Sequence, residues 1–150
     1  MDMEETLYVA KTLFDMYLKQ TGAYMDEMKM HKLMYFSQRE SLMYNHEALF
    51  TEDFYGWKYG PVLKSVRSEY MKNTPFCDVH GNVSAQTEML LKSVLQRYGA
   101  ESSWKLSSLS HGEFSWKMAR KGLKASENGN VKLPLAAMEV DAARELASRN

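Results

Sequence analysis

The chain has 150 residues, of which 45% are hydrophobic and 25% charged, a composition typical of one ordinary globular domain. Its 19 basic residues are balanced by 19 acidic ones, so the formal net charge is zero. This balance argues against nucleic-acid binding, which usually shows as a basic excess or a basic stripe.

The location of the protein is also constrained by its sequence. No apolar run approaches the roughly 20 residues that a membrane-spanning helix needs. The acidic start Met-Asp-Met-Glu-Glu lacks the basic and then apolar pattern of a signal peptide. The single cysteine, Cys77, rules out an internal disulfide. We therefore expect a cytoplasmic protein that has no contact with a membrane.

The first predicted helix covers residues 4–21. Its apolar residues recur at positions i, i+3, i+4, i+7 and i+8, which places them on one face. Gly22 offers a C-terminal stop, and the short link to residue 25 makes the next helix fold back against this one. The apolar face consists of Ala10, Leu13, Phe14, Tyr17 and Leu18.

The helix predicted for residues 26–45 is the one around which we expect the others to pack. Asp26 is a suitable N-cap residue, and no Gly or Pro interrupts the segment. Apolar residues occupy most of its circumference, and a helix of this kind is buried on most sides. One side carries Met30, Leu33, Met34, Ser37 and Ser41, and the rest carries Met28, Tyr35, Phe36, Leu42 and Met43.

Aromatic residues alternate over residues 54–58, which predicts a small two-stranded β element near this segment. Gly60 and Pro61 are expected to stop that run and to start a third helix, with proline at its first position, that reaches about Lys72.

The second half of the chain predicts four more helices. One is capped by Ser84 and closed by Gly99, and a short one begins at Ser102 or Ser103. Another short helix contains Trp116, and the last begins near Leu135. The expected fold is mainly α, a single compact bundle of six or seven helices around residues 26–45, with residues 1–150 forming one domain.

The sequence contains no clear enzyme signature. The chain has no glycine-rich phosphate loop and no Gly-x-Ser-x-Gly elbow. His111 and Glu113 are close in sequence, but without a third ligand they make a poor metal site. We therefore predict no enzymatic activity, no metal and no cofactor. The alternative hypothesis is a small hydrolase or metal-dependent enzyme that uses His111 and Glu113, with Cys77 as a further candidate.

Three sequence blocks resemble the Panacea domain, the family of SocA-like antitoxins. The first, Met-Lys-Met-His-Lys-Leu-Met-Tyr-Phe, begins at Met28 and is similar to the family's Lys-Leu-x-Lys-Leu-Leu-Tyr-Phe helix. Next come a Leu-Phe at residue 49 and Gly-Trp-Lys-Tyr-Gly-Pro-Val at residue 56. The third, Leu-Ser-Ser-Leu-Ser-His-Gly-Glu-Phe-Ser-Trp, begins at Leu106 and resembles a Leu-x-x-Leu-Thr-His-x-Glu-x-Pro-Trp segment. The departures are Gly56 for Ala, Ser110 for Thr and Ser115 for Pro.

The resemblance implies an antitoxin that neutralises a cognate protein toxin encoded nearby, often on a prophage or other mobile element. At least one branch of the family acts as a proteolytic adaptor, handing its toxin to an ATP-dependent protease. Neither role needs a catalytic residue. The resemblance does not identify the toxin.

The residues of these blocks that we consider as candidates for partner binding have two interpretations. In the structural one, Gly60 permits a turn, and His111 with Glu113 links two short helices. In the functional one, the aromatic residues line a partly exposed groove, since Trp and Tyr supply much of the energy of protein–protein contacts. The candidates are Trp57, Tyr59, Gly60, Pro61, His111, Glu113 and Trp116.

Overall fold

The structure is a computed structural model that describes residues 3–150. Within this range the chain forms seven α-helices and one two-stranded antiparallel sheet, so the predicted mainly α architecture is confirmed. The elements in chain order are α1 (Thr6–Thr21), α2 (Glu27–Tyr44), β1 (Tyr55–Trp57), β2 (Gly60–Val62), α3 (Lys64–Tyr70), α4 (Ala85–Tyr98), α5 (Ser103–His111), α6 (Phe114–Ala119) and α7 (Leu135–Ser148).

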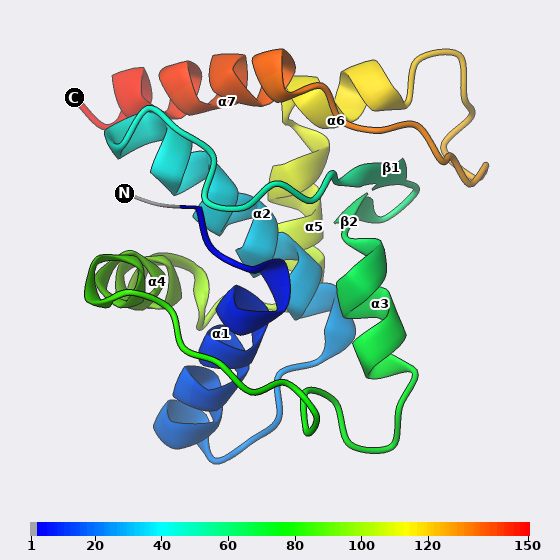
Figure 1. Ribbon diagram of the computed structural model, residues 1–150. Coiled ribbons are helices and arrows are strands. Elements are labelled where there is room, and N and C mark those ends of the chain that lie inside the picture. Colours follow the sequence, from blue (N-terminus) through cyan, green and yellow to red (C-terminus); the bar gives the residue numbers. More distant parts are fainter. Residues whose placement is uncertain (1–2) are drawn as a thin grey trace.

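Helix α2 lies at the centre of the molecule, as its sequence predicts. Every residue from Lys29 to Met43 is buried, and α1, α3, α4, α5, α7 and β2 all contact the helix (Figure 1). The Asp26 side chain accepts a hydrogen bond from the Lys29 backbone nitrogen at 2.7 Å, which confirms it as the N-cap. The other elements are therefore arranged around one helix that is shielded from water nearly throughout.

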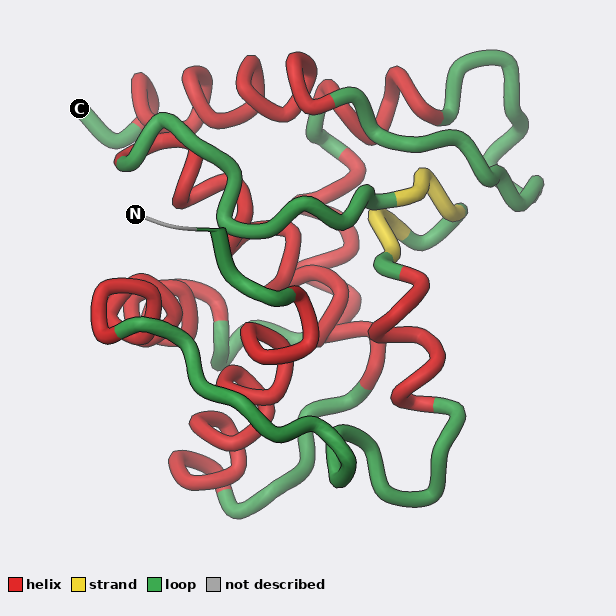
Figure 2. Tube along the Cα trace, in the orientation of Figure 1, coloured by secondary structure: helices red, strands yellow, loops and turns green. Residues whose placement is uncertain are grey.

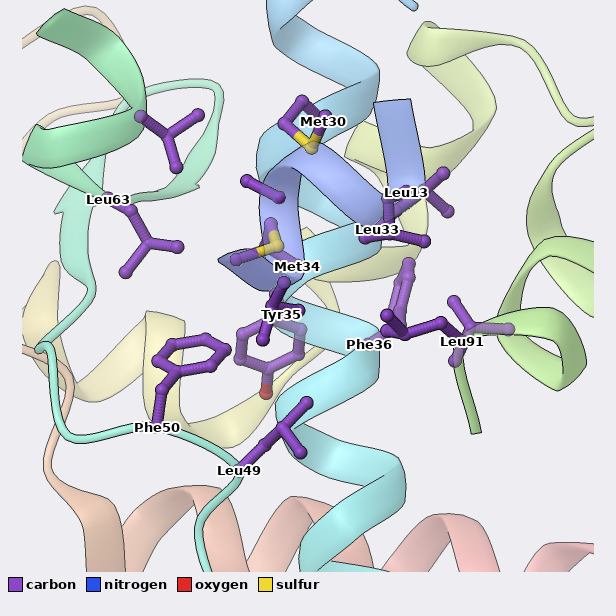
Figure 3. Close-up of a cluster of buried hydrophobic side chains, with 14 of the residues drawn as sticks. Leu13, Met30, Leu33, Met34, Tyr35, Phe36, Leu49, Phe50, Leu63 and Leu91 are labelled. Atoms are coloured by element: carbon purple, nitrogen blue, oxygen red, sulfur yellow. The ribbon is translucent and has the colours of Figure 1, made fainter. Parts of the chain in front are cut away.

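Aromatic side chains leave α2 in different directions and join it to its neighbours. Figure 3 shows Tyr35 beside Phe50 on one side of the helix and Phe36 near Leu91 on the other. The Phe36 ring also stacks on Tyr98 of α4, with centroids 4.4 Å apart. Burying an aromatic side chain of this size contributes roughly 2–3 kcal/mol. The two directions explain why neither side of α2 is available to solvent.

The segment after β1 corrects one sequence prediction. Gly60 and Pro61 do not start a helix: they form β2, which pairs antiparallel with β1 in the register Trp57 to Gly60 and Gly56 to Pro61. Helix α3 begins only at Lys64. Pro61 is tolerated because an outer strand of a two-stranded sheet can lack one N–H donor. Pairing with β1 therefore outweighs the helix-start preference of proline.

The loop before α7 extends the small sheet. The Gly56 nitrogen donates to the Val131 oxygen at 2.9 Å, and the Leu133 nitrogen donates to the Phe54 oxygen at 2.8 Å. Figure 2 shows this loop passing beside the hairpin on its way to α7.

In the part of the chain that the structure describes, no helix is both long enough and apolar enough to cross a bilayer.

Candidate functional site

The turn of the β1–β2 hairpin is held against α5 and α6 by side chains from those helices. The Trp116 indole nitrogen donates to the Trp57 carbonyl at 2.8 Å. The Ser107 hydroxyl donates to the Tyr59 carbonyl, also at 2.8 Å. Both bonds satisfy backbone oxygens of a short turn, so the loop has a defined position although it lies at the surface.

His111 occupies the last position of α5 and stacks on Trp116. Their ring centroids are 4.1 Å apart and the planes differ by 5°. Burial lowers the pKa of His111, and the positive charges of Lys32 and Arg120 lower it further, whereas a hydrogen bond with the Tyr59 backbone opposes them. The imidazole is therefore neutral near pH 7. It acts as a flat packing surface between α5 and α6.

Gly60 brings the hairpin unusually close to α2. Its φ is +125°, and a Cβ placed on it would lie 2.6 Å from the Lys32 ammonium nitrogen and 2.8 Å from the Ser110 hydroxyl. Only glycine fits such a position without a shift of its neighbours. The three sequence blocks singled out above thus meet at one point, since Lys32, Gly60 and Ser110 each come from a different block.

An exposed aromatic pair lies beside this point. Tyr59 is 49% exposed and Trp104 of α5 is 67% exposed, and their rings meet edge to face at 5.9 Å. We call Trp57, Tyr59, Trp104 and Trp116 the aromatic surface. Sequence analysis did not select Trp104 as a candidate. Its exposure could have been predicted from its position. Trp104 lies two residues before the buried Leu106, and residues two positions apart on a helix face different sides.

Glu113 does not join the other candidates. Its carboxylate pairs with the guanidinium of Arg39, which also donates to the Tyr98 hydroxyl at 2.7 Å. Burial and the neighbouring Asp141 raise the pKa of Glu113, whereas Arg39 lowers it, and the net result is a pKa of about 7. Arg39, Tyr98, Glu113 and Asp141 line a separate cavity of about 450 Å³ between α2, α4, α5 and α7. Glu113 is thus part of an ion-paired cluster inside the bundle.

The positions of His111 and Glu113 bear on the alternative enzyme hypothesis. His111 stacks on Trp116, whereas Glu113 pairs with Arg39, so the two side chains are engaged by different partners. Among residues 3–150, no group of three or more His, Cys, Asp or Glu side chains is arranged to hold a metal ion. Cys77 is exposed in the loop between α3 and α4. The arrangement favours a role of His111 in packing and of Glu113 in joining helices.

Comparison with known proteins agrees with the sequence blocks. A family model described as antitoxin SocA-like, Panacea domain, matches residues 30–117. The matched range runs from the first turn of α2 into α6, and it includes Lys32, Gly60 and Ser110. The resemblance inferred from those blocks is therefore confirmed. No curated protein and no solved structure matches the chain.

Proposed function

The chain belongs to the Panacea-domain family of SocA-like antitoxins, and from this premise we propose that it neutralises a cognate protein toxin by direct binding. The aromatic surface defined above is the proposed contact region. It lies within the matched residues, and Trp and Tyr side chains are enriched among the residues that dominate binding energy at protein interfaces.

The observation that carries this proposal is the exposed pair Tyr59 and Trp104. Tyr59 is 49% exposed and Trp104 is 67% exposed, and the two rings contact each other. The backbone of Tyr59 is held by a hydrogen bond from the Ser107 hydroxyl. A preorganised aromatic pair loses little conformational freedom on binding, which favours affinity. Two large rings in mutual contact at the surface are a suitable anchor for a protein partner.

Co-expression tests the proposal. The product of the neighbouring gene should arrest growth alone and should be harmless together with this protein. A Tyr59→Ala/Trp104→Ala double variant should fail to protect but remain folded, with its unfolding free energy lowered by about 1–2 kcal/mol because both side chains are only partly buried. Tyr24→Ala is a matched control, since Tyr24 is 75% exposed but lies outside the aromatic surface.

Two results would count against the proposal. If the neighbouring product is harmless alone, or remains toxic beside the wild-type protein, this chain is not its antitoxin. If the double variant protects as well as Tyr24→Ala does, the toxin is bound elsewhere on the molecule.

The proposal has a second, finer form, in which the protein is a cytoplasmic adaptor that passes its toxin to an ATP-dependent protease. A location of the gene pair on a prophage or another mobile element would be consistent with it. The adaptor form predicts that the toxin's half-life falls when this chain is present. Equal half-lives with and without the chain would leave sequestration as the mode of neutralisation.

A further inference from the structure

Lys32 is a buried cation without a hydrogen-bond acceptor. The residue is 2% exposed and lines a cavity. Within residues 3–150 the group found to favour its charged form is the carboxylate of Asp26, which acts through its charge and not through a hydrogen bond. Lys29, one turn earlier on α2, is satisfied, because its ammonium donates to the Gly99 carbonyl at 2.8 Å. A buried ammonium that lacks a partner is strongly unfavourable. The contrast between Lys29 and Lys32 on the same helix indicates that Lys32 has a role other than packing.

The carboxylate of Asp26 does not fulfil this need. Asp26 favours the charged form of Lys32, but burial outweighs it and lowers the pKa of Lys32 to about 8. The Asp26 carboxylate already caps α2 through the Lys29 nitrogen and accepts a bond from the Ser103 hydroxyl at 3.0 Å. Lys32 thus remains largely charged near pH 7, and Asp26 offsets its positive charge only in part.

Lys32 lines a cavity of about 460 Å³ that opens beside the aromatic surface. Its apolar walls are Met28, Trp57, Tyr59 and Val62. The polar residues that line it beside Lys32 are Glu27, His31, Lys58, Arg67 and Asn128. An occupant that combines a short apolar stem with a negative end matches both features.

The remaining charges around the cavity are also suited to an anion. The Glu27 carboxylate is already engaged: it accepts a hydrogen bond from Arg67 at 2.7 Å and contacts the His31 ring nitrogen at 3.0 Å. Lys58 lies 5.1 Å from the centre of the Tyr59 ring and adds a second positive charge at the cavity. A phosphate group is usually held by several N–H donors or by an arginine fork. The Arg67 guanidinium at this cavity is already paired with Glu27, so the buried donor that remains is the single ammonium of Lys32.

We infer that the Lys32 ammonium receives a carboxylate of the partner polypeptide, an Asp or Glu side chain whose methylene stem lies against Trp57 and Tyr59. This inference rests on the proposed function, because it takes the toxin as the polypeptide that supplies the carboxylate. It assigns charge recognition to Lys32, while the neighbouring exposed rings contribute apolar contact.

The test compares Lys32→Met with the wild type. Methionine removes the charge and keeps an unbranched side chain, and loss of an unpaired buried charge leaves the melting temperature unchanged or raised. Binding of the neighbouring gene's product is measured by titration calorimetry. Removing one member of a desolvated charge pair should weaken binding by about 30-fold or more. Lys92→Met, at an exposed position on α4, makes the same change in net charge and should bind like the wild type.

Matching substitutions in the toxin complete the experiment. Each Asp and Glu of the toxin is changed to Asn or Gln, and one such variant should bind the wild type more weakly by a similar factor. The same toxin variant should lose no further affinity for Lys32→Met, because the pair is already broken. This coupling would not arise from a general loss of positive charge.

The outcomes separate this inference from the proposed function. If the wild type does not bind the toxin, the proposed function fails and the inference fails with it. If the wild type binds and Lys32→Met binds with equal affinity, only the inference is overturned. Inorganic phosphate titrated without the toxin provides a last check. Phosphate binding that depends on Lys32, with toxin binding unaffected in Lys32→Met, would identify a free anion as the occupant and overturn the inference.

Discussion

The carboxylate of Asp141 accepts a hydrogen bond from the backbone nitrogen of Ser115 at 2.9 Å, although the two residues are 26 positions apart. Asp141 also accepts from the Phe114 nitrogen at 2.6 Å. A side chain of α7 thereby satisfies the free N–H groups at the start of α6, whose own N-cap residue makes no side-chain capping bond. Proline at position 115, as in the Panacea segment, would have no N–H to donate.

Replacing Asp141 should therefore destabilise the protein. Asp141 is 2% exposed, and it accepts a third bond, from the Tyr35 hydroxyl at 2.9 Å. Asp141→Ala leaves three donors without this acceptor and should lower the unfolding free energy by about 2–4 kcal/mol, as measured by urea denaturation. Glu139→Ala, at an exposed position on the same helix, should change it by less than about 0.5 kcal/mol. Equal denaturation midpoints for the two variants would refute the capping role.

Gly60→Ala should destabilise more than Gly22→Ala. Both glycines have positive φ, +125° and +73°, but a Cβ at Gly22 would have no atom within 4 Å. Gly22→Ala therefore carries only backbone strain, about 1–2 kcal/mol. At Gly60 the methyl group also meets Lys32 and Ser110, so we expect a loss of about 3 kcal/mol or more. Thermal unfolding of the two variants measures the difference, and similar melting temperatures would show that the hairpin can move away from α2.

Trp116→Phe should loosen the hairpin without unfolding the protein. Phenylalanine keeps an aromatic face for His111 but cannot donate to the Trp57 carbonyl, so the unfolding free energy should fall by about 1 kcal/mol. Hydrogen exchange should become faster for the amides of the hairpin and remain unchanged in α4. Trp104→Phe, at an exposed site, serves as the control and should alter neither quantity. Unchanged exchange in Trp116→Phe would mean that the indole bond does not hold the loop.

Glu113 should make stability fall as the pH rises. Its pKa of about 7 in the folded chain exceeds the ordinary value of 4.5, so the folded state binds the proton more tightly. The stabilising contribution is complete below pH 4.5 and is lost as the pH passes 7, a change of at most about 3 kcal/mol. Burial lowers the pKa values of His31 and His111, which gives the opposite slope below pH 6.5. The difference between the wild type and Glu113→Gln therefore isolates the Glu113 effect.

The measurement is the unfolding free energy of both proteins by urea denaturation between pH 4 and pH 8. Because Glu113→Gln cannot titrate at this position, the wild type should lose stability relative to the variant over that range. A constant difference would show that the Arg39 pair keeps Glu113 ionised throughout.

Residues 26–45 show what the sequence alone could determine. The Asp26 cap, the length of the helix and its burial on most sides follow from side chains within one or two turns of each other. The Panacea blocks likewise needed no structure, because order and spacing along the chain carry that signal. The same local rules located α1, α4, α5, α6 and α7 to within a few residues.

Tertiary structure decided the features that depend on residues distant in the chain. Pro61 became part of a strand because β1 pairs with it, a contact that no local preference of proline reveals. Glu113 pairs with Arg39, which lies 74 positions earlier and carries the opposite charge inside the bundle, and not with the neighbouring His111. The lack of a hydrogen-bond partner for Lys32 follows from the tertiary structure, because the β1–β2 hairpin packs against α2 at this residue. Pairing and burial over such separations set the candidate site, whereas capping and periodicity set the helices.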